Sequence, residues 1–188
     1  MRFLSLLVLL AFVAAPASFA QSTVAAADWP EANPAEVATT DAIVDALYEV
    51  ISGPSDVDRD WDRFRSLMHP EGRLIPIAQR PDGTSAPVVY SADEYAEVAG
   101  QIFRESPMFQ GKGFYEVEAT RRVERYGTIA HVWSTYESRF DPSEEEPFSR
   151  GINSIQLVWD GSRWHVLSIT WHQETEGTPI PAPYLPEG

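Results

Sequence analysis

Two stretches decide the fold of this 188-residue chain: residues 113–140, GFYEVEATRRVERYGTIAHVWSTYESRF, and residues 150–174, RGINSIQLVWDGSRWHVLSITWHQE. Side chains alternate between two faces along both stretches, which is the period of a β-strand rather than of a helix. Tyr126-Gly127 and Asp160-Gly161 supply tight turns, because glycine adopts positive φ without steric cost. The pattern therefore predicts a meander of four antiparallel strands, at 114–126, 128–140, 150–159 and 163–174.

The alternation also assigns residues to the two faces of the predicted sheet. Pairing about the first turn sets Val123 opposite Ala130 and Arg121 opposite Val132, with these four residues on the covered face. The acidic residues of the first two strands are expected on the outer face: Glu116, Glu118, Glu124 and Glu137. In the last strand the covered face is expected to hold Trp164, Val166, Ser168, Thr170 and His172, and the outer face His165, Leu167, Ile169 and Trp171.

The segment before the meander has the period of helices. Apolar stripes with i, i+3, i+4 spacing predict a helix from Thr40 or Asp41 to Ile51 and a shorter one that ends before His69-Pro70. Ser91 and Glu94 form a capping box, which predicts a third helix that ends before Pro107. A hairpin at residues 73–90 separates the second and third helices. Three helices covering one face of a mainly antiparallel sheet define an α+β fold.

This order of elements resembles the nuclear transport factor 2-like superfamily, a cone-shaped α+β fold that includes SnoaL-like polyketide cyclases and ketosteroid isomerases. The resemblance covers residues 40–174. LMHPEGRLIP at 67–76 looks like the helix-to-strand passage of secreted bacterial members, and RGINSIQL at 150–157 followed by DGSRW at 160–164 looks like their final hairpin. The resemblance implies three helices over a concave sheet, with a pocket at the open end of the cone. It does not fix an activity, because this cone hosts isomerases, cyclases, dehydratases, ligand binders and dimerisation modules.

The N-terminus has the three parts of a signal peptide: basic Arg2, an apolar run at 3–15, and a small-residue cleavage site that predicts a cut between Ala20 and Gln21. The sequence thus predicts a signal peptide at 1–20, a flexible leader at 21–39, the folded domain at 40–174 and a proline-rich tail at 175–188. We expect the mature protein in the periplasm or secreted, with no membrane attachment. The chain has no cysteine, so no disulfide can stabilise it.

The mature chain is strongly acidic. Without Arg2 it has 13 basic and 28 acidic residues, hence a net charge of −15. Such a field disfavours nucleic acids and anionic membranes as partners. Its few histidines do not converge on the predicted sheet, no Gly-rich phosphate loop is present, and no serine-nucleophile motif occurs. We therefore expect no metal and no cofactor.

A small-molecule pocket is expected on the covered face. Its predicted polar lining is Tyr48, Arg121, Ser134, Tyr136, Asn153, Ser168, Thr170 and His172. Enzymes of the resembling fold set a base against an oxyanion donor, and His172 with Tyr136 is the pair that fits this pattern. A solvent-facing His172 and a structurally paired Tyr136 are the alternative. Arg121 either pairs with a buried carboxylate or receives an anionic ligand.

The other face of the sheet carries an apolar patch that includes Trp133, Leu167, Ile169 and Trp171. Because monomers rarely expose so large a patch, we expect a homodimer through this face, with coverage by the leader or the tail as the alternative. Three functions stay open: a binding domain for a small, partly apolar molecule; an isomerase-, cyclase- or dehydratase-type enzyme using the His-Tyr pair; and a homodimeric interaction module with a filled pocket.

Overall fold

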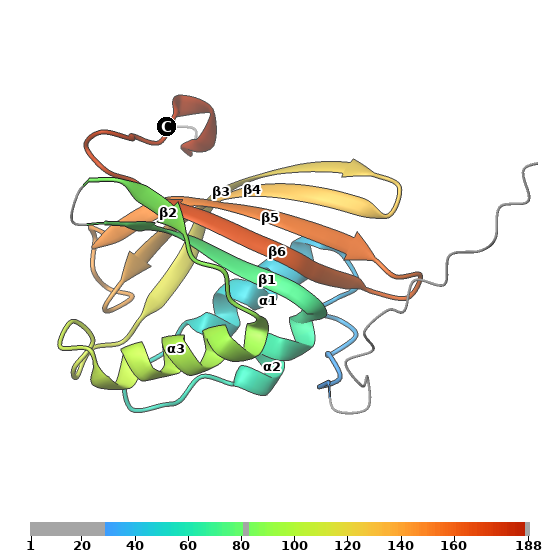
Figure 1. Cartoon of the computed structure of the whole chain (residues 1–188), viewed down its shortest axis with the longest axis horizontal. Helices are drawn as coiled ribbons and strands as arrows, with labels where there is room; N and C mark the ends of the chain where they lie inside the picture. Colours follow the sequence, from blue (N-terminus) through green and yellow to red (C-terminus); the bar gives the residue numbers. More distant parts are fainter. Residues whose placement is uncertain (1–28, 81–82, 187–188) are drawn as a thin grey trace, which may run out of the picture.

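The structure is a computed structural model of the chain, and it describes residues 29–80 and 83–186. In these residues three α-helices lie against one six-stranded sheet (Figure 1). The helices are α1 (Thr40–Ile51), α2 (Trp61–Leu67) and α3 (Ala92–Glu105). The strands are β1 (Met68–Gln79), β2 (Ser85–Pro87), β3 (Tyr115–Tyr126), β4 (Ile129–Arg139), β5 (Ser149–Trp159) and β6 (Trp164–Gln173), and a short 3-10 helix, η2 (Ala182–Tyr184), follows them.

The helices begin where oxygen-bearing side chains can cap them. The Thr39 hydroxyl accepts a hydrogen bond from the Ala42 amide at the start of α1. At α3 the Ser91 hydroxyl accepts from the Glu94 amide while the Glu94 carboxylate accepts from the Ser91 amide, so the predicted capping box is confirmed. None of the helices in the described ranges is long and apolar enough to cross a membrane.

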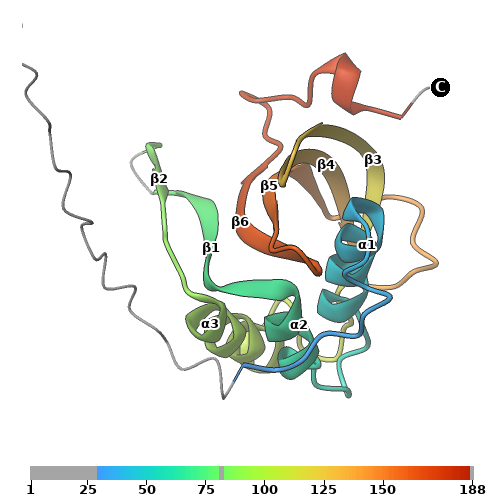
Figure 2. The same cartoon turned by 90° about the vertical axis from the view of Figure 1, so that its right-hand side faces the viewer.

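The sheet has the strand order β2-β1-β6-β5-β4-β3, with β1 parallel to β6 and the other neighbours antiparallel. It curves strongly, and the three helices lie on its concave side (Figure 2). The core between them is almost fully apolar, with Ile43, Leu67, Val132, Ile155 and Val166 all 0–1 % exposed. The predicted α+β cone is confirmed.

A β-bulge interrupts the alternation in β3. Glu118 pairs with Tyr136, whereas Thr120 pairs with the adjacent Thr135, so Ala119 is the extra residue. The bulge puts Glu116 and Glu118 on the same face as Arg121. The predicted inward position of Arg121 is confirmed, but the prediction that Glu116 and Glu118 face outward is wrong.

A second bulge has the same effect in β6. Leu157 pairs with Val166 and Gln156 with Ser168, which leaves Leu167 as the extra residue, 42 % exposed. Trp164 and Val166 are buried before the bulge, and Ile169 and Trp171 face the core after it. The predicted covered positions of Ser168, Thr170 and His172 are therefore wrong, as are the predicted outer positions of Ile169 and Trp171.

The hairpin between β3 and β4 differs from the prediction in register. Val123 pairs with Val132 rather than Ala130, and Arg121 with Ser134 rather than Val132, because the turn residues are Gly127 and Thr128. This two-residue shift preserves the alternation. The faces predicted for β4 are therefore confirmed, with Ala130, Val132, Ser134, Tyr136 and Ser138 all buried.

The C-terminal segment crosses the convex face of the sheet, on the side away from the helices (Figures 1 and 2). Ile180 is 8 % exposed, and the Thr135 hydroxyl donates to the Tyr184 carbonyl at 2.6 Å. The rings of Trp133 and Tyr184 lie 5.7 Å apart. Coverage of Trp133 by the tail, the alternative to a dimer, is thus present. The homodimer stays a prediction, with Leu167 still exposed on this face.

The N-terminal end of the described chain also packs on the domain. The Trp29 indole N–H donates to the Met68 carbonyl at 3.2 Å, and Val37 is 2 % exposed. Part of the predicted leader, residues 29–39, thus belongs to the folded unit. The predicted signal peptide at 1–20 and the rest of the leader lie outside the described residues.

Candidate functional site

A cavity of about 280 Å³ lies between the helices and the concave face of the sheet. Most of its wall is apolar or aromatic, and its polar groups come from α1, α3, β3, β4, β5 and β6. Its lining includes Leu47, Tyr48, Phe64, Leu74, Ile77, Tyr95, Phe114, Glu116, Tyr136, Ser138, Phe148, Ser149, Asn153, Ile155, Ile169, Trp171 and Gln173. Side chains of the protein do not fill this cavity. The interaction module considered from the sequence would have a filled pocket.

Glu116 is the charged group in this lining. The bulge in β3 turns it inward, and the Ser138 hydroxyl donates to its Oε2 at 3.0 Å. Burial raises the pKa of Glu116 to about 7, although hydrogen bonding to Ser138 and Asn153 opposes the rise. Among the described residues that line the cavity there is no arginine, lysine or histidine. The carboxyl group can therefore exchange a proton near neutral pH.

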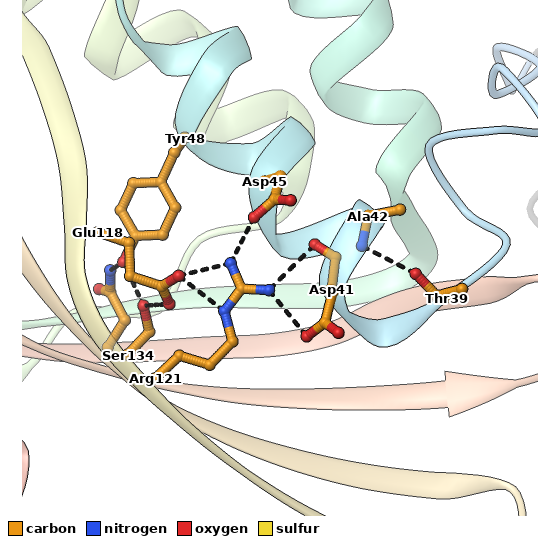
Figure 3. Close-up of polar contacts among 9 residues, drawn as sticks. Thr39, Asp41, Ala42, Asp45, Tyr48, Glu118, Arg121 and Ser134 are labelled. Carbon is orange, nitrogen blue, oxygen red and sulfur yellow. Dashed lines mark hydrogen bonds and ion pairs between the residues drawn. The ribbon is translucent and has the colours of Figure 1, made fainter.

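A directed chain of hydrogen bonds connects Asn153 with Glu118, and Figure 3 shows its members Tyr48, Ser134 and Glu118. The Asn153 amide donates to the Tyr48 hydroxyl at 3.1 Å, and Tyr48 and Ser134 lie 2.5 Å apart. Because Ser134 donates to Glu118, it accepts from Tyr48. This arrangement fixes the Tyr48 ring on α1 against β4 and β5, at the wall of the cavity.

This series of hydrogen bonds ends at Glu118, which belongs to a cluster of charges around Arg121 (Figure 3). Its guanidinium lies 3.0 Å from Asp41, 2.5 Å from Asp45 and 2.5 Å from Glu118. These carboxylates raise the pKa of Arg121, although burial opposes the rise. The guanidinium is thus saturated by side chains of the protein itself, which leaves a structural role rather than the anionic-ligand role considered for Arg121.

Two further tyrosines line the cavity as neutral hydrogen-bonding groups. Burial, with the nearby Glu116 charge, raises the pKa of the Tyr95 and Tyr136 phenols well above their usual range. Tyr136 lies over Gly151, where a Cβ atom would stand 2.6 Å from the phenol oxygen. Glycine at this position therefore makes room for the Tyr136 ring.

An open cleft of about 740 Å³ adjoins the cavity between α1, β3 and the loop after β4. It shares Tyr48 and Glu116 with the cavity, so these two residues stand between the enclosed space and solvent. The other charged residues that line the cleft are Asp45, Glu49, Glu118, Arg139 and Glu144. The route to Glu116 from this side is therefore strongly acidic.

The structure brings together part of the predicted site. Tyr48, Tyr136 and Asn153 line the cavity, and Ser134 supports it through its bond to Tyr48. Ser168, Thr170 and His172 lie on the convex face. There the His172 Nε2 atom is buried close to the tail, with no hydrogen-bond partner among the described residues. The predicted His172-Tyr136 pair is not assembled, because the two side chains lie on opposite faces of the sheet.

Glu116 is the residue that the sequence reasoning missed. Tyr115, Val117 and Ala119 form an apolar alternation that favours burial of the wrong face, yet Val117 is 48 % exposed. The run of charges from Glu116 to Arg121 was the available signal, since an inward arginine needs inward carboxylates. In the described residues no group of three or more histidine, aspartate or glutamate side chains is arranged so that it could hold a metal ion.

No protein-family model matches the sequence, and no curated protein matches it. Solved structures do match in fold. A nuclear transport factor 2-like protein of unknown function from Pseudomonas putida KT2440 is 11 % identical, with a TM-score of 0.51 over 74 % of this chain and 88 % of that one. A cystatin-like-fold protein of unknown function from Nostoc punctiforme is 8 % identical, with a TM-score of 0.51 over 71 % and 87 %. A β subunit attributed to an aromatic-ring-hydroxylating dioxygenase of Novosphingobium aromaticivorans is 14 % identical, with a TM-score of 0.53 over 74 % and 94 %.

Proposed function

We propose that this chain, whose fold is that of the nuclear transport factor 2-like proteins, binds a small, partly apolar molecule in its cavity. The observation that supports this most strongly is the inward Glu116, held by Ser138 in a space that the protein leaves open. Ligand sites are typically concave and mostly apolar, with a few convergent polar groups. Glu116, Asn153 and Tyr48 have this arrangement, and the predicted export places the binding event outside the cytoplasm.

Blocking the cavity tests the proposal. Ser149→Trp adds a large ring at the end of β5, where Ser149 lines the cavity. Gln156→Trp, at an exposed position on the same strand, is the matched control. We expect small aromatic fragments to shift NMR signals of cavity residues in the wild type and in Gln156→Trp, but not in Ser149→Trp. Fragment-induced shifts confined to surface residues in the wild type would contradict the proposal.

A second candidate is an enzyme that moves a proton to or from its ligand. It is favoured by the pKa of about 7 at Glu116 with neutral phenols nearby, because a general base works best when its pKa lies near the working pH. Glu116 replaces His172 as the proposed base. Tyr136 is the proposed donor to a developing oxyanion, because the single Tyr48 O–H already donates to Ser134.

Hydrogen exchange at a carbon acid separates binding from catalysis. Cyclohexanone in D₂O exchanges its α-protons slowly, and the exchange is followed by NMR. If Glu116 acts as a base, the protein accelerates the exchange and Glu116→Gln lowers this acceleration by about 10²-fold or more. If the ketone binds without accelerated exchange, the result is consistent with the binding function and contradicts the enzymatic one.

A further inference from the structure

The surroundings of Glu116 point to the charge of the ligand. Each element packed around this carboxyl presents a neutral group to it: Tyr48 from α1, Tyr95 from α3, Tyr136 and Ser138 from β4, and Asn153 from β5. The next inward carboxylate on β3, Glu118, already has Arg121 as its partner. Glu116 is thus an acidic group for which the described lining supplies hydrogen bonds but no positive charge.

The walls around this carboxyl suit a positive charge. Seven aromatic side chains are among the described residues of the lining: Tyr48, Phe64, Tyr95, Phe114, Tyr136, Phe148 and Trp171. The ring centroids of Tyr95 and Trp171 are 5.8 Å apart, and those of Phe64 and Tyr95 are 5.6 Å apart, so the rings form a continuous wall. Aromatic faces attract cations, and sites for quaternary ammonium groups use this attraction together with apolar contact.

The described lining of the cleft that leads to the cavity holds no unpaired positive charge. In the cleft beside α1, Glu49 is paired with Arg63 at 2.7 Å and Asp45 with Arg121. Arg139, the positive residue that lines the cleft, is paired with Glu137 at 2.7 Å. The chain as a whole carries a net charge of −14. This field attracts cations and repels anions before they reach the cavity.

We infer that the cavity takes an organic cation, a protonated amine or a quaternary ammonium group on an apolar body, whose charge pairs with Glu116 and whose body contacts the aromatic wall. This inference rests on the proposed function and names its ligand class. It excludes carboxylates and phosphates as ligands. It also distinguishes the site from one for a neutral carbonyl compound, whose binding gains nothing from charge pairing with Glu116.

A series of ligands with one body and three charges tests the inference. The probes are 2-phenylethylamine, 2-phenylethanol and 3-phenylpropanoate, which are cationic, neutral and anionic at neutral pH. Binding is measured by NMR titration with the purified protein. We expect the amine to bind about tenfold or more tightly than the alcohol, and the anion most weakly. Equal affinity for amine and alcohol, or tighter binding of the anion, overturns the inference and leaves the binding function. Failure of all three overturns both.

Glu116→Gln and Glu124→Gln locate the effect. Both remove one carboxylate from β3, and Glu124 is exposed near the far end of the strand. We expect Glu116→Gln to lower amine affinity to that of the alcohol, with alcohol affinity unchanged, while Glu124→Gln retains the preference for the amine. Equal losses in the two variants attribute the preference to the overall field and overturn the assignment to Glu116.

The pH dependence of binding gives an independent readout. If the amine pairs with ionised Glu116, its affinity is highest above the pKa of about 7 and falls as the pH drops below it, until it reaches the affinity of Glu116→Gln. This dependence disappears in Glu116→Gln. Affinity for the amine that rises as the pH falls overturns the inference, because it shows that the protonated form of Glu116 binds the ligand.

Discussion

Glu116 and Glu118 lie two residues apart on the same face of β3, yet their surroundings differ. Glu118 lies 2.5 Å from the Arg121 guanidinium, which Asp41 and Asp45 also contact. Glu116 has the Ser138 hydroxyl and the Asn153 amide, and burial raises its pKa to about 7. Glu118 therefore belongs to a neutralised, structural set of charges, whereas Glu116 is an acidic group open to a cavity.

The difference shows how a ligand site can be separated from an ion cluster. A buried charge destabilises a fold unless a partner compensates for it. Around Arg121 the compensation comes from the protein itself. At Glu116 it is left to a proton or to a ligand, which is the pattern expected where function is favoured over stability. The following changes test this contrast, in order of expected effect.

Arg121→Met removes the cation from the structural set of charges. It leaves Asp41, Asp45 and Glu118 without their shared cation, and Glu118 is only 16 % exposed. We expect the free energy of unfolding to fall by about 3 kcal/mol, as for other ion pairs that lose one partner. Urea denaturation measures this loss.

Arg104→Met is the matched control for this change. Arg104 is 56 % exposed and lies 3.9 Å from Asp58, so its loss costs about 0.5 kcal/mol or less. Comparable losses in the two variants would show that the Arg121 cluster has no special weight in stability.

Glu116→Gln removes the carboxylate on the functional side of the comparison. It is expected to raise the free energy of unfolding, whereas Arg121→Met lowers it. Because the folded-state pKa of about 7 exceeds the ordinary value of 4.5, the contribution of Glu116 to stability is complete below pH 4.5 and is lost as the pH rises through 7. Glutamine imitates the protonated acid. At about pH 8 we expect the variant to be more stable than wild type by about 2 kcal/mol, a value reduced to allow for the partial exposure of Glu116.

The same variant at a pH well below 4.5 is the control, since Glu116 of the wild type is then protonated in both the folded and the unfolded state. Urea denaturation at the two pH values gives the difference. A variant that is destabilised at the higher pH would mean that the ionised carboxylate is well compensated within the protein.

Tyr48→Phe sharpens the comparison, because the Tyr48 hydroxyl joins the two regions. It accepts from Asn153 and donates to Ser134, which in turn donates to Glu118. Its removal leaves the Asn153 amide and the Ser134 oxygen each short of a partner. We expect a loss of about 1–2 kcal/mol in urea denaturation. A change below 0.5 kcal/mol, about the size of a surface substitution, would show that the network is not cooperative.

Ser138→Ala has the smallest expected effect and acts only on Glu116. The hydroxyl donates to Oε2 at 3.0 Å and favours the ionised form. Without the Ser138 hydroxyl, the pKa of Glu116 rises above 7, and the free energy of unfolding changes by about 1 kcal/mol. NMR of ¹³C-labelled glutamate side chains follows the titration. A pKa that falls in the variant would show that the hydrogen bond favours the protonated acid.

The helices and the four-stranded meander could be predicted from local chemistry, whereas the parallel pairing of β1 with β6 was not predicted. Ser91 and Glu94 mark the start of α3, and the glycines at 127 and 161 mark the two hairpins, because each signal lies within a few residues of the feature that it specifies. Tyr48, Tyr136 and Asn153 were placed correctly because α1 and β4 have regular periods and Asn153 lies in an uninterrupted strand.

The part of the site on β3 and β6 could not be predicted, because one extra residue reverses the alternation between the residues before it and those after it. Ala119 and Leu167 carry no local signal for a bulge, and both strands have apolar residues on both faces. The pairing of Arg121 with Asp41 and Asp45 joins residues about 80 positions apart and depends on the finished packing of α1 against β3. For this reason the prediction placed His172 on the covered face and Glu116 on the outer face, the reverse of their positions in the structure.

The measurement that tests the central claim most directly is the pKa of the Glu116 side chain in the ligand-free protein, assigned by comparison with Glu116→Gln in ¹³C NMR spectra. A buried carboxyl without a cation partner titrates near 7. Titration near the ordinary value of 4.5 would mean that Glu116 is solvated or already compensated, and the contrast between Glu116 and Glu118 would be lost.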